Sequence, residues 1–251
     1  MSDTRLYISY RTPNIGDDVQ TLACIAQHEH TLDLDFNRLL FIDRDRPVDP
    51  GPGHVLSVNC WYSLSRKPKG FPLSIKQRLV SVHLRYSSNN VPGPVRQWLS
   101  ALQPIGCRDT HTVRVCHALG LVADFKACPT LDMRSFHLPT YEKHHRILLV
   151  DCRAEVDGAE RETHQLQPSQ FDLTPGQRLE VARSKLMRYA GAAGVVTSRI
   201  HCAFPCIGMG IPVFFVPDGR DKTRFGGYEA LLQHTNRKFI DALGIEPRIT
   251  T

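Results

Sequence analysis

The sequence lacks any hydrophobic run long enough to cross a membrane. Its longest apolar stretches, Ile147–Val150 and Ile211–Val216, have the length of buried strands, whereas a membrane helix needs roughly 18 apolar residues. The first ten residues include an acid and lack the apolar segment of a signal peptide. We therefore expect a cytoplasmic protein, with at most a peripheral contact to the inner face of a membrane.

Cysteine pairs with metal-ligand spacing are also missing. The eight cysteines include no C-x-x-C pair, so the common zinc spacing is absent and no metal is expected. The pairs His28/His30 and His144/His145 fit a helix end and a linker better than a metal site. A chain of 251 residues builds a sufficient core without disulfides, so the cysteines are expected to be reduced and mostly buried.

Basic residues are not gathered into runs. Lys and Arg number 31 against 25 Asp and Glu, which gives a net charge of +6, yet no five basic residues are consecutive. A moderate excess of positive charge favours anionic partners. Because this charge is spread along the chain, a small anionic ligand is a better expectation than a nucleic-acid surface.

The order of apolar runs indicates an α/β protein with mostly parallel sheets, because short buried strands alternate with segments of helical periodicity. We expect two Rossmann-like halves, 1–136 and 147–251, joined by a polar linker at 137–146. The second half would end in a helical tail, made of two short pieces at 228–233 and 237–243. The expected strands include 6–10, 39–42, 54–60, 79–84, 105–107, 123–128, 147–150, 194–197 and 212–216. The expected helices include 17–28, 94–102, 109–119, 177–190 and 202–209.

The most informative segment follows the strand expected at 194–197. It carries Thr197, Ser198, Arg199 and His201 to the carboxyl end of that strand, where a helix begins. Ligands of open α/β sheets bind at this edge, and a helix N-terminus favours anions. Arg199 offers a bidentate fork to a carboxylate or phosphate, and His201 offers a proton near neutral pH. The structural alternative is an arginine in an ion pair and a histidine at a helix cap.

Two further turns join a strand to a helix. In the first, Gly16 permits a tight turn, and Asn14 and Asp17 either cap the helix or hold substrate hydroxyls. In the second, Arg108 stands at the junction and Asp109 is expected to cap the helix. Since no G-x-G-x-x-G pattern is present, dinucleotide binding receives little support.

A polar loop after the last expected strand, residues 218–225, carries Lys222 and Arg224. It would lie at the same edge of the sheet as Arg199. Its charges either contact an anion or are simply solvated.

Taken together, the segments NIGDDVQ, IGCRDTHT, VVTSRIHCAFPCIGMGIPVFFV and DKTRFGGYEALL resemble the polysaccharide pyruvyl transferase family. The resemblance covers residues 13–235 in patches. It implies a GT-B-like arrangement of two Rossmann-like domains, with the acceptor on the N-terminal side and phosphoenolpyruvate on the C-terminal side. It also implies transfer of a pyruvyl group to a sugar of a glycan or glycoside, in the manner of polysaccharide and exopolysaccharide biosynthesis. No cofactor is implied beyond this co-substrate.

The family's Arg-x-His motif matches Arg199 and His201, and its mid-chain Gly-x-Arg matches Arg108. The resemblance then implies that Arg199 and Arg108 clamp the donor across an interdomain cleft. It makes His201 the general acid or phosphate ligand, and Asp17 the residue that orients or deprotonates the acceptor hydroxyl. The donor set is completed by Thr197, Ser198, Asn14, Gly16, Lys222 and Arg224.

Other functions stay open at this stage. The chain is shorter than many family members, so the acceptor ranges from a polysaccharide to a small glycoside or a membrane-borne lipid-linked sugar. A GT-B glycosyltransferase would place the diphosphate of a nucleotide-sugar at the same strand end. A carbohydrate- or anion-binding protein without turnover would bind ligand and release no phosphate. A nucleic-acid binder is least favoured, since it would show a steep salt dependence.

Overall fold

The fold is described from a computed structural model, which covers residues 3–62, 70–219 and 222–250. These residues form two compact units, each made of several chain segments. Unit 1 comprises Met1–Arg11, Arg38–Cys128 and Lys222–Gly227, and unit 2 comprises Thr12–Asn37, Pro129–Asp221 and Tyr228–Thr251. The structure is thus α/β with mostly parallel sheets, as the sequence predicts.

Unit 1 is built on a parallel four-stranded sheet in the order β2 (Leu40–Asp43), β1 (Thr4–Ser9), β3 (His54–Val58) and β5 (Lys76–Leu79). Two short parallel pairs accompany it: β4 (Trp61–Tyr62) with β6 (His83–Leu84), and β7 (Ile105–Cys107) with β8 (Ala123–Phe125). Helices α2 (Gly93–Ala101) and α3 (Thr110–Ala118) contribute Trp98, Leu99 and Cys116 to one continuous apolar core.

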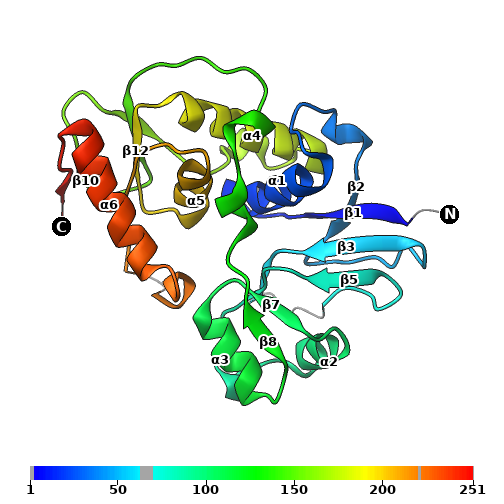
Figure 1. Ribbon diagram of the computed structural model, residues 1–251. Helices are drawn as coiled ribbons and strands as arrows, with labels where there is room; N and C mark the ends of the chain where they lie inside the picture. Colours follow the sequence, from blue (N-terminus) through cyan, green and yellow to red (C-terminus); the bar gives the residue numbers. More distant parts are fainter. Residues whose placement is uncertain (1–2, 63–69, 220–221, 251) are drawn as a thin grey trace. The chain divides into compact units, whose positions relative to one another are not determined.

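Unit 2 repeats this strand order with β11 (Glu160–Glu162), β9 (Ile147–Val150), β12 (Gly194–Thr197) and β13 (Val213–Phe215). Helix α6 (Glu229–Leu243) buries Phe239 against Val196 and Phe214 of this sheet. Helices α1 (Ile15–Glu29), α4 (Pro175–Gly191) and α5 (Ile200–Gly208) pack against one another, and α5 lies beside β12 (Figure 1). An antiparallel pair, β10 (Ala154–Glu155) with β14 (Arg248–Ile249), completes the unit.

The units divide the chain differently from the predicted halves. Helix α1 follows strand β1 of unit 1 but belongs to unit 2, and residues 222–227 return from unit 2 to unit 1. The reason lies in long-range packing, because the buried Arg178 of α4 holds Asp18 of α1 through two hydrogen bonds of 3.1 and 2.7 Å. Sequence periodicity identifies such helices but not their packing partners.

The strands predicted at 54–60 and 123–128 end earlier, at Val58 and Phe125, and two further predictions are wrong in the number of elements. The strand expected at 79–84 is two strands, β5 and β6, because the amides of Val80 and Ser81 both turn back to the carbonyl of Val58. The two terminal pieces are one helix, α6. Its polar middle stays helical because the Asn236 side chain bonds the amide and carbonyl of Phe215 in β13.

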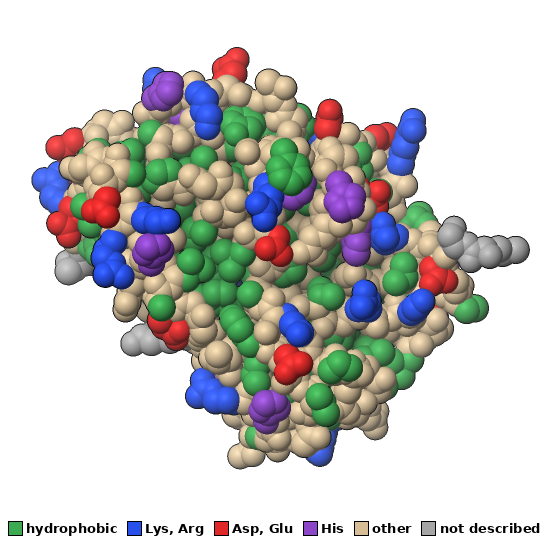
Figure 2. All heavy atoms as spheres, in the orientation of Figure 1, with side chains coloured by type: hydrophobic (Ala, Val, Ile, Leu, Met, Phe, Trp, Pro, Cys, Tyr) green, Lys and Arg blue, Asp and Glu red, His purple; other side chains and the backbone are tan. Residues whose placement is uncertain are grey.

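Among the described residues, no helix combines the length and the apolar character needed to cross a bilayer. Seven of the cysteines are buried and Cys152 is partly buried, all as free thiols. On the face shown in Figure 2, basic side chains are interspersed with acidic side chains and histidines.

Candidate functional site

A cavity lies at the carboxyl edge of the sheet of unit 2. Its volume is about 310 Å³, and its walls include Asp151, Ser198, Arg199 and Val216, which follow strands β9, β12 and β13. Strands β9 and β12 are neighbours in the sheet although far apart in the sequence. In the strand order of unit 2, this pair marks the topological switch point, where open α/β sheets bind ligands. The cavity therefore lies where the fold favours a ligand.

Arg199 lines this cavity and keeps most of its donors available. Its Nε donates to Asp151 Oδ2 at 2.9 Å, and its side chain is 31% exposed. The two Nη groups have no partner within the described part of the chain. The structural alternative, an arginine in an ion pair, is thus observed. The ion pair nevertheless uses only Nε and leaves the two Nη groups of the guanidinium available. A guanidinium fixed through Nε in this way is oriented to bind a carboxylate or phosphate.

Ser198 and Thr197 hold the strand end together beside Arg199. Ser198 Oγ donates to the carbonyl of Asp151 at 2.6 Å and lines the cavity. Thr197 is fully buried and does not line it. Its hydroxyl donates to the carbonyl of Val150 and accepts from the amide of Arg199. Both residues are predicted to bind the donor. The structure places Ser198 at the cavity, whereas Thr197 lies beneath it and holds the strand end in place.

His201 lies in the first turn of α5 and packs against the start of α1. It is 2% exposed and is not among the residues that line the cavity. A Cβ added to Gly16 would lie 3.0 Å from His201 Cβ and 3.2 Å from its Nδ1. The absence of a side chain at Gly16 is what admits the imidazole. Two segments that are remote in sequence, NIGDD and SRIH, therefore meet within unit 2.

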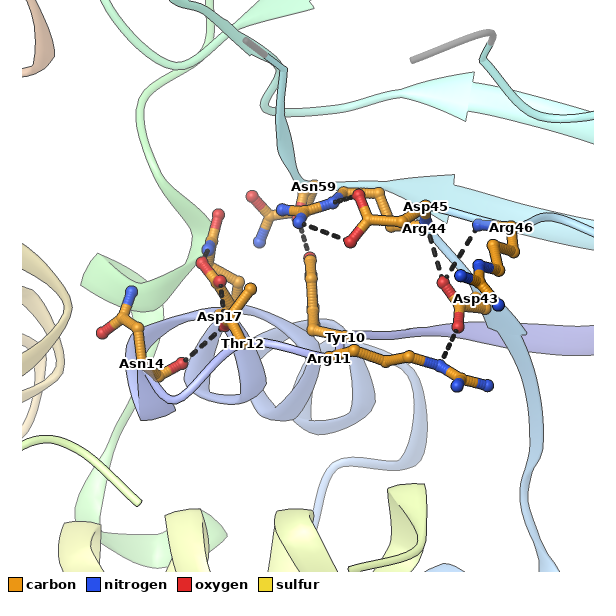
Figure 3. A network of polar contacts seen from close by, with 11 residues as sticks. Tyr10, Arg11, Thr12, Asn14, Asp17, Asp43, Arg44, Asp45, Arg46 and Asn59 are labelled. Carbon is orange, nitrogen blue, oxygen red and sulfur yellow. Dashed lines mark hydrogen bonds and ion pairs between the residues drawn. The ribbon is translucent and has the colours of Figure 1, made fainter. Parts of the chain in front are cut away.

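Asn14 and Asp17 are held by local contacts. The Asn14 side chain accepts the amide of Gly16 at 3.2 Å and caps α1. Asp17 is buried and accepts from the Thr12 hydroxyl at 2.7 Å and from Gln20 Nε2 at 3.3 Å (Figure 3). These contacts fit the predicted helix cap for Asn14. They make Asp17 part of the support under the first turn of α1.

Arg153 is a cavity residue that sequence reasoning missed. It follows β9 by three positions, lines the cavity and is exposed. The segment from 151 to 175 is polar and irregular in sequence, so no periodicity marks Arg153. The available signal was its position directly beyond the carboxyl end of a buried parallel strand.

His164 contacts the cavity residue Asp151 and was also not predicted from the sequence. It is fully buried, its amide donates to Asp151 Oδ2, and its Nδ1 lies 3.0 Å from the hydroxyl of Tyr189. Burial lowers the pKa of His164 from 6.5 to about 3, and the Arg199 charge adds to this against the opposing Asp151 carboxylate. The residue that holds Asp151 in its ion pair with Arg199 therefore carries a neutral imidazole.

A second set of predicted residues lies in unit 1. The buried Arg108 precedes α3, and Arg224 belongs to the 3₁₀ helix Lys222–Phe225. The Lys222 side chain and all of Arg220 and Asp221 lie outside the described residues. Within unit 1, Arg108 and Arg224 both act electrostatically on His83. The structure thus divides the predicted site residues between the two units.

The buried pair of His83 and Asp109 was not predicted. His83 Nδ1 lies 2.6 Å from Asp109 Oδ2, while Asp109 Oδ1 accepts the amide of Thr112 and caps α3. The cap is the role that the sequence predicts for Asp109. Burial lowers the pKa of His83 from 6.5 to about 4, and the charges of Arg108 and Arg224 add to this against the Asp109 carboxylate.

At the corresponding edge of the unit 1 sheet, several side chains contact one another. The Tyr10 hydroxyl, after β1, donates to the carbonyl of Asn59, after β3, at 3.1 Å (Figure 3). The Arg44 guanidinium lies 4.9 Å from the centre of the Tyr10 ring and 4.8 Å from that of Trp61. It also bonds Asp45 through two nitrogens at 3.0 and 3.1 Å.

No cluster of three or more His, Cys, Asp or Glu with the geometry of a metal site occurs in the residues that the structure covers. Comparison with known proteins gives a structural likeness only. No family model and no curated protein matches the chain. The crystal structure of an uncharacterized protein from Klebsiella pneumoniae matches with a TM-score of 0.53 at 15% identity, over 97% of this chain and 90% of that one. This likeness concerns the fold alone.

Proposed function

We propose that the protein is a pyruvyl transferase that moves the pyruvyl group of phosphoenolpyruvate onto sugar hydroxyls and releases phosphate. One observation carries the proposal: the NIGDD and SRIH segments of the family resemblance meet at Gly16 and His201, and Arg199 of the second segment lines the cavity. A GT-B-like arrangement of two Rossmann-like domains is part of this proposal.

The donor binds in the cavity of unit 2 under this proposal. Its volume, about 310 Å³, lies at the lower end of the range for small-molecule sites and suits a three-carbon anion. Arg199 binds an anionic group of the donor through its two Nη groups. The N-terminal turn of α5, which no side chain caps, offers further polar contacts to that anion.

The two hydroxyl groups of the acceptor supply the two protons that the products carry. Carbon 3 of the donor takes up one proton, which makes carbon 2 electrophilic. A sugar hydroxyl attacks carbon 2, the bond from carbon 2 to the phosphate oxygen breaks, and a second hydroxyl closes the ketal. Of the two hydroxyl protons, one ends on the new methyl group and the other on phosphate. The family resemblance, not the cavity lining, assigns His201 the role of general acid or donor to the leaving phosphate, since the imidazole is buried against Gly16 and does not line the cavity. Asp17 lies beside it in the first turn of α1.

The test is incubation of the protein with phosphoenolpyruvate and galactose-, mannose- and glucose-type acceptors. The readouts are phosphate release and an acceptor mass increased by one pyruvyl unit. We expect Arg199→Ala and His201→Ala to lower the rate by about 10²-fold or more, the range for a proton-transfer or charge-stabilising group. Arg108→Ala and Arg224→Ala test the unit 1 residues in the same assay.

Three results would overturn the proposal. The first is full activity in both the Arg199 and the His201 variant. The second is turnover of a nucleotide-sugar, with no product from phosphoenolpyruvate, which would indicate a glycosyltransferase. Binding of phosphoenolpyruvate without any release of phosphate would instead indicate a binding protein.

A further inference from the structure

We infer that Arg153 is a second anion-binding residue of the unit 2 cavity, where it and Arg199 hold one small anion between two guanidinium groups. The identity of that anion as phosphoenolpyruvate rests on the proposed function. The two-arginine site itself rests only on the geometry of unit 2.

The backbone around Arg153 is fixed on both sides. Arg153 stands between Asp151, which follows β9, and strand β10. Its carbonyl accepts the amide of Thr250 at 3.1 Å, where β14 pairs with β10. Asp151 has a φ of 44°, an uncommon backbone conformation for a residue with a side chain. The chain is thereby turned sharply so that Asp151 and Arg153 both line the cavity.

The charge of Arg153 is available to a ligand. Its side chain is exposed and makes no hydrogen bond or ion pair within the described ranges. Arg199 donates to Asp151 through its Nε only. The cavity thus presents two guanidinium groups from neighbouring strand ends, and arginine forks are the preferred protein partners of carboxylates and phosphates.

Two carboxylates, Asp151 and Asp218, also line the cavity. A negative charge near a bound anion weakens its binding. Asp151 is held by Arg199 Nε and by the amide of His164. Asp218 lines the cavity after β13 and adds a negative charge near the bound anion. Removing the charge of Asp218 is therefore expected to strengthen anion binding, whereas removing that of Arg153 weakens it.

The experiment measures binding of phosphoenolpyruvate and of inorganic phosphate by calorimetry to the full chain and four variants. We expect Arg153→Ala to weaken phosphoenolpyruvate binding about tenfold or more, Arg153→Lys to weaken it less, and Asp218→Asn to strengthen it. Arg237→Ala is the matched control, because Arg237 is exposed on α6, outside the cavity lining, and its loss changes the net charge equally. Circular dichroism checks that each variant is folded.

The outcomes separate this inference from the proposed function. Equal affinities in wild type, Arg153→Ala and Arg237→Ala would overturn the role of Arg153, even if pyruvyl transfer occurs. Weaker binding in Arg153→Ala alone, without pyruvyl transfer to any acceptor, would support the two-arginine site and count against the transferase. Absence of phosphoenolpyruvate and phosphate binding to the wild type would overturn the inferred site.

Discussion

The contact between Gly16 and His201 depends on the absence of a single carbon atom. A Cβ at Gly16 would lie 3.0 Å from His201 Cβ, closer than ordinary van der Waals contact. We expect Gly16→Ala to lower the free energy of unfolding by about 1–3 kcal/mol, as overpacking of a tight contact does. It should also lower phosphate release by displacing the imidazole.

Urea denaturation followed by circular dichroism measures the cost of Gly16→Ala. The matched background is His201→Gly, in which the added methyl group has space and should cost less. An equal loss in both backgrounds would show that His201 is not the group that the methyl displaces.

The buried histidines make stability depend on pH. The folded pKa of His83 is about 4, below its ordinary value of 6.5, so the unfolded chain binds more protons between these values. The contribution of His83 to stability is therefore complete above pH 6.5 and falls as the pH drops toward 4. Asp18 of unit 2, whose pKa burial raises to about 7, acts in the opposite direction between these values. The loss from His83 is expected to reach about 3 kcal/mol, because one pKa unit corresponds to about 1.4 kcal/mol. His164 acts in the same direction in unit 2.

Both tryptophans, Trp61 and Trp98, lie in unit 1, so their fluorescence follows the unit that contains His83. Urea unfolding recorded by this signal between pH 7.5 and 4.5 should show a falling midpoint. The slope should be shallower in His83→Asn, which has no proton to take up. An unchanged slope in that variant would count against the neutral buried imidazole.

At the scale of elements, α1 and α4 are joined by a buried ion pair. Arg178 bonds both oxygens of Asp18 and the carbonyl of Thr12, and each charged side chain is 4% exposed. Burial raises the pKa of Asp18 to about 7 even beside Arg178, so in Arg178→Met the carboxyl group takes up a proton, and the loss is expected at the lower end of the range for a broken buried pair, about 3 kcal/mol. The double variant Asp18→Leu with Arg178→Met should lose less, and thermal unfolding by circular dichroism compares them. A double variant as unstable as the sum of the singles would contradict this account.

The pairing of β14 with β10 positions Arg153. Thr250→Pro removes the amide that donates to the Arg153 carbonyl, whereas Thr250→Ala keeps it. We expect the proline variant to bind phosphoenolpyruvate more weakly than the alanine variant, with little change in unfolding temperature; the alanine variant controls for loss of the Thr250 side chain, which lines the cavity. Equal affinities in the two variants would mean that β14 does not position the arginine.

Local sequence patterns predict part of the site, and long-range packing determines the rest. The buried strand Gly194–Thr197 was predicted with its observed bounds, because four apolar or small residues lie between a helix and a polar turn. The placement of Arg199 and Ser198 at a strand-end cavity followed from the same local pattern. Arg153 and the contact of Gly16 with His201 could not be predicted, since both depend on segments brought together only by the fold.

At the scale of the whole molecule, the proposed function predicts how a bound ligand changes stability and which segments it protects from hydrogen exchange. Phosphoenolpyruvate at about 100 times its dissociation constant should add about 2.7 kcal/mol to stability. Hydrogen exchange should slow in the segments after β9, β12 and β13, and around Thr250. Mass spectrometry of exchanging peptides measures this, with a nucleotide-sugar as the parallel ligand. Protection by the nucleotide-sugar alone would favour a glycosyltransferase.

The assignment of α1 to unit 2 has a consequence for synthesis on the ribosome. Asp18 and its partner Arg178 are separated by 160 positions. At translation rates of about 5–20 residues per second, α1 leaves the exit tunnel about 8–30 s before the helix that covers it. During this interval its apolar face, including Val19, Leu22 and Ile25, has no native partner on α4. The nascent chain should therefore be a substrate for chaperones that shield apolar helices until α4 emerges.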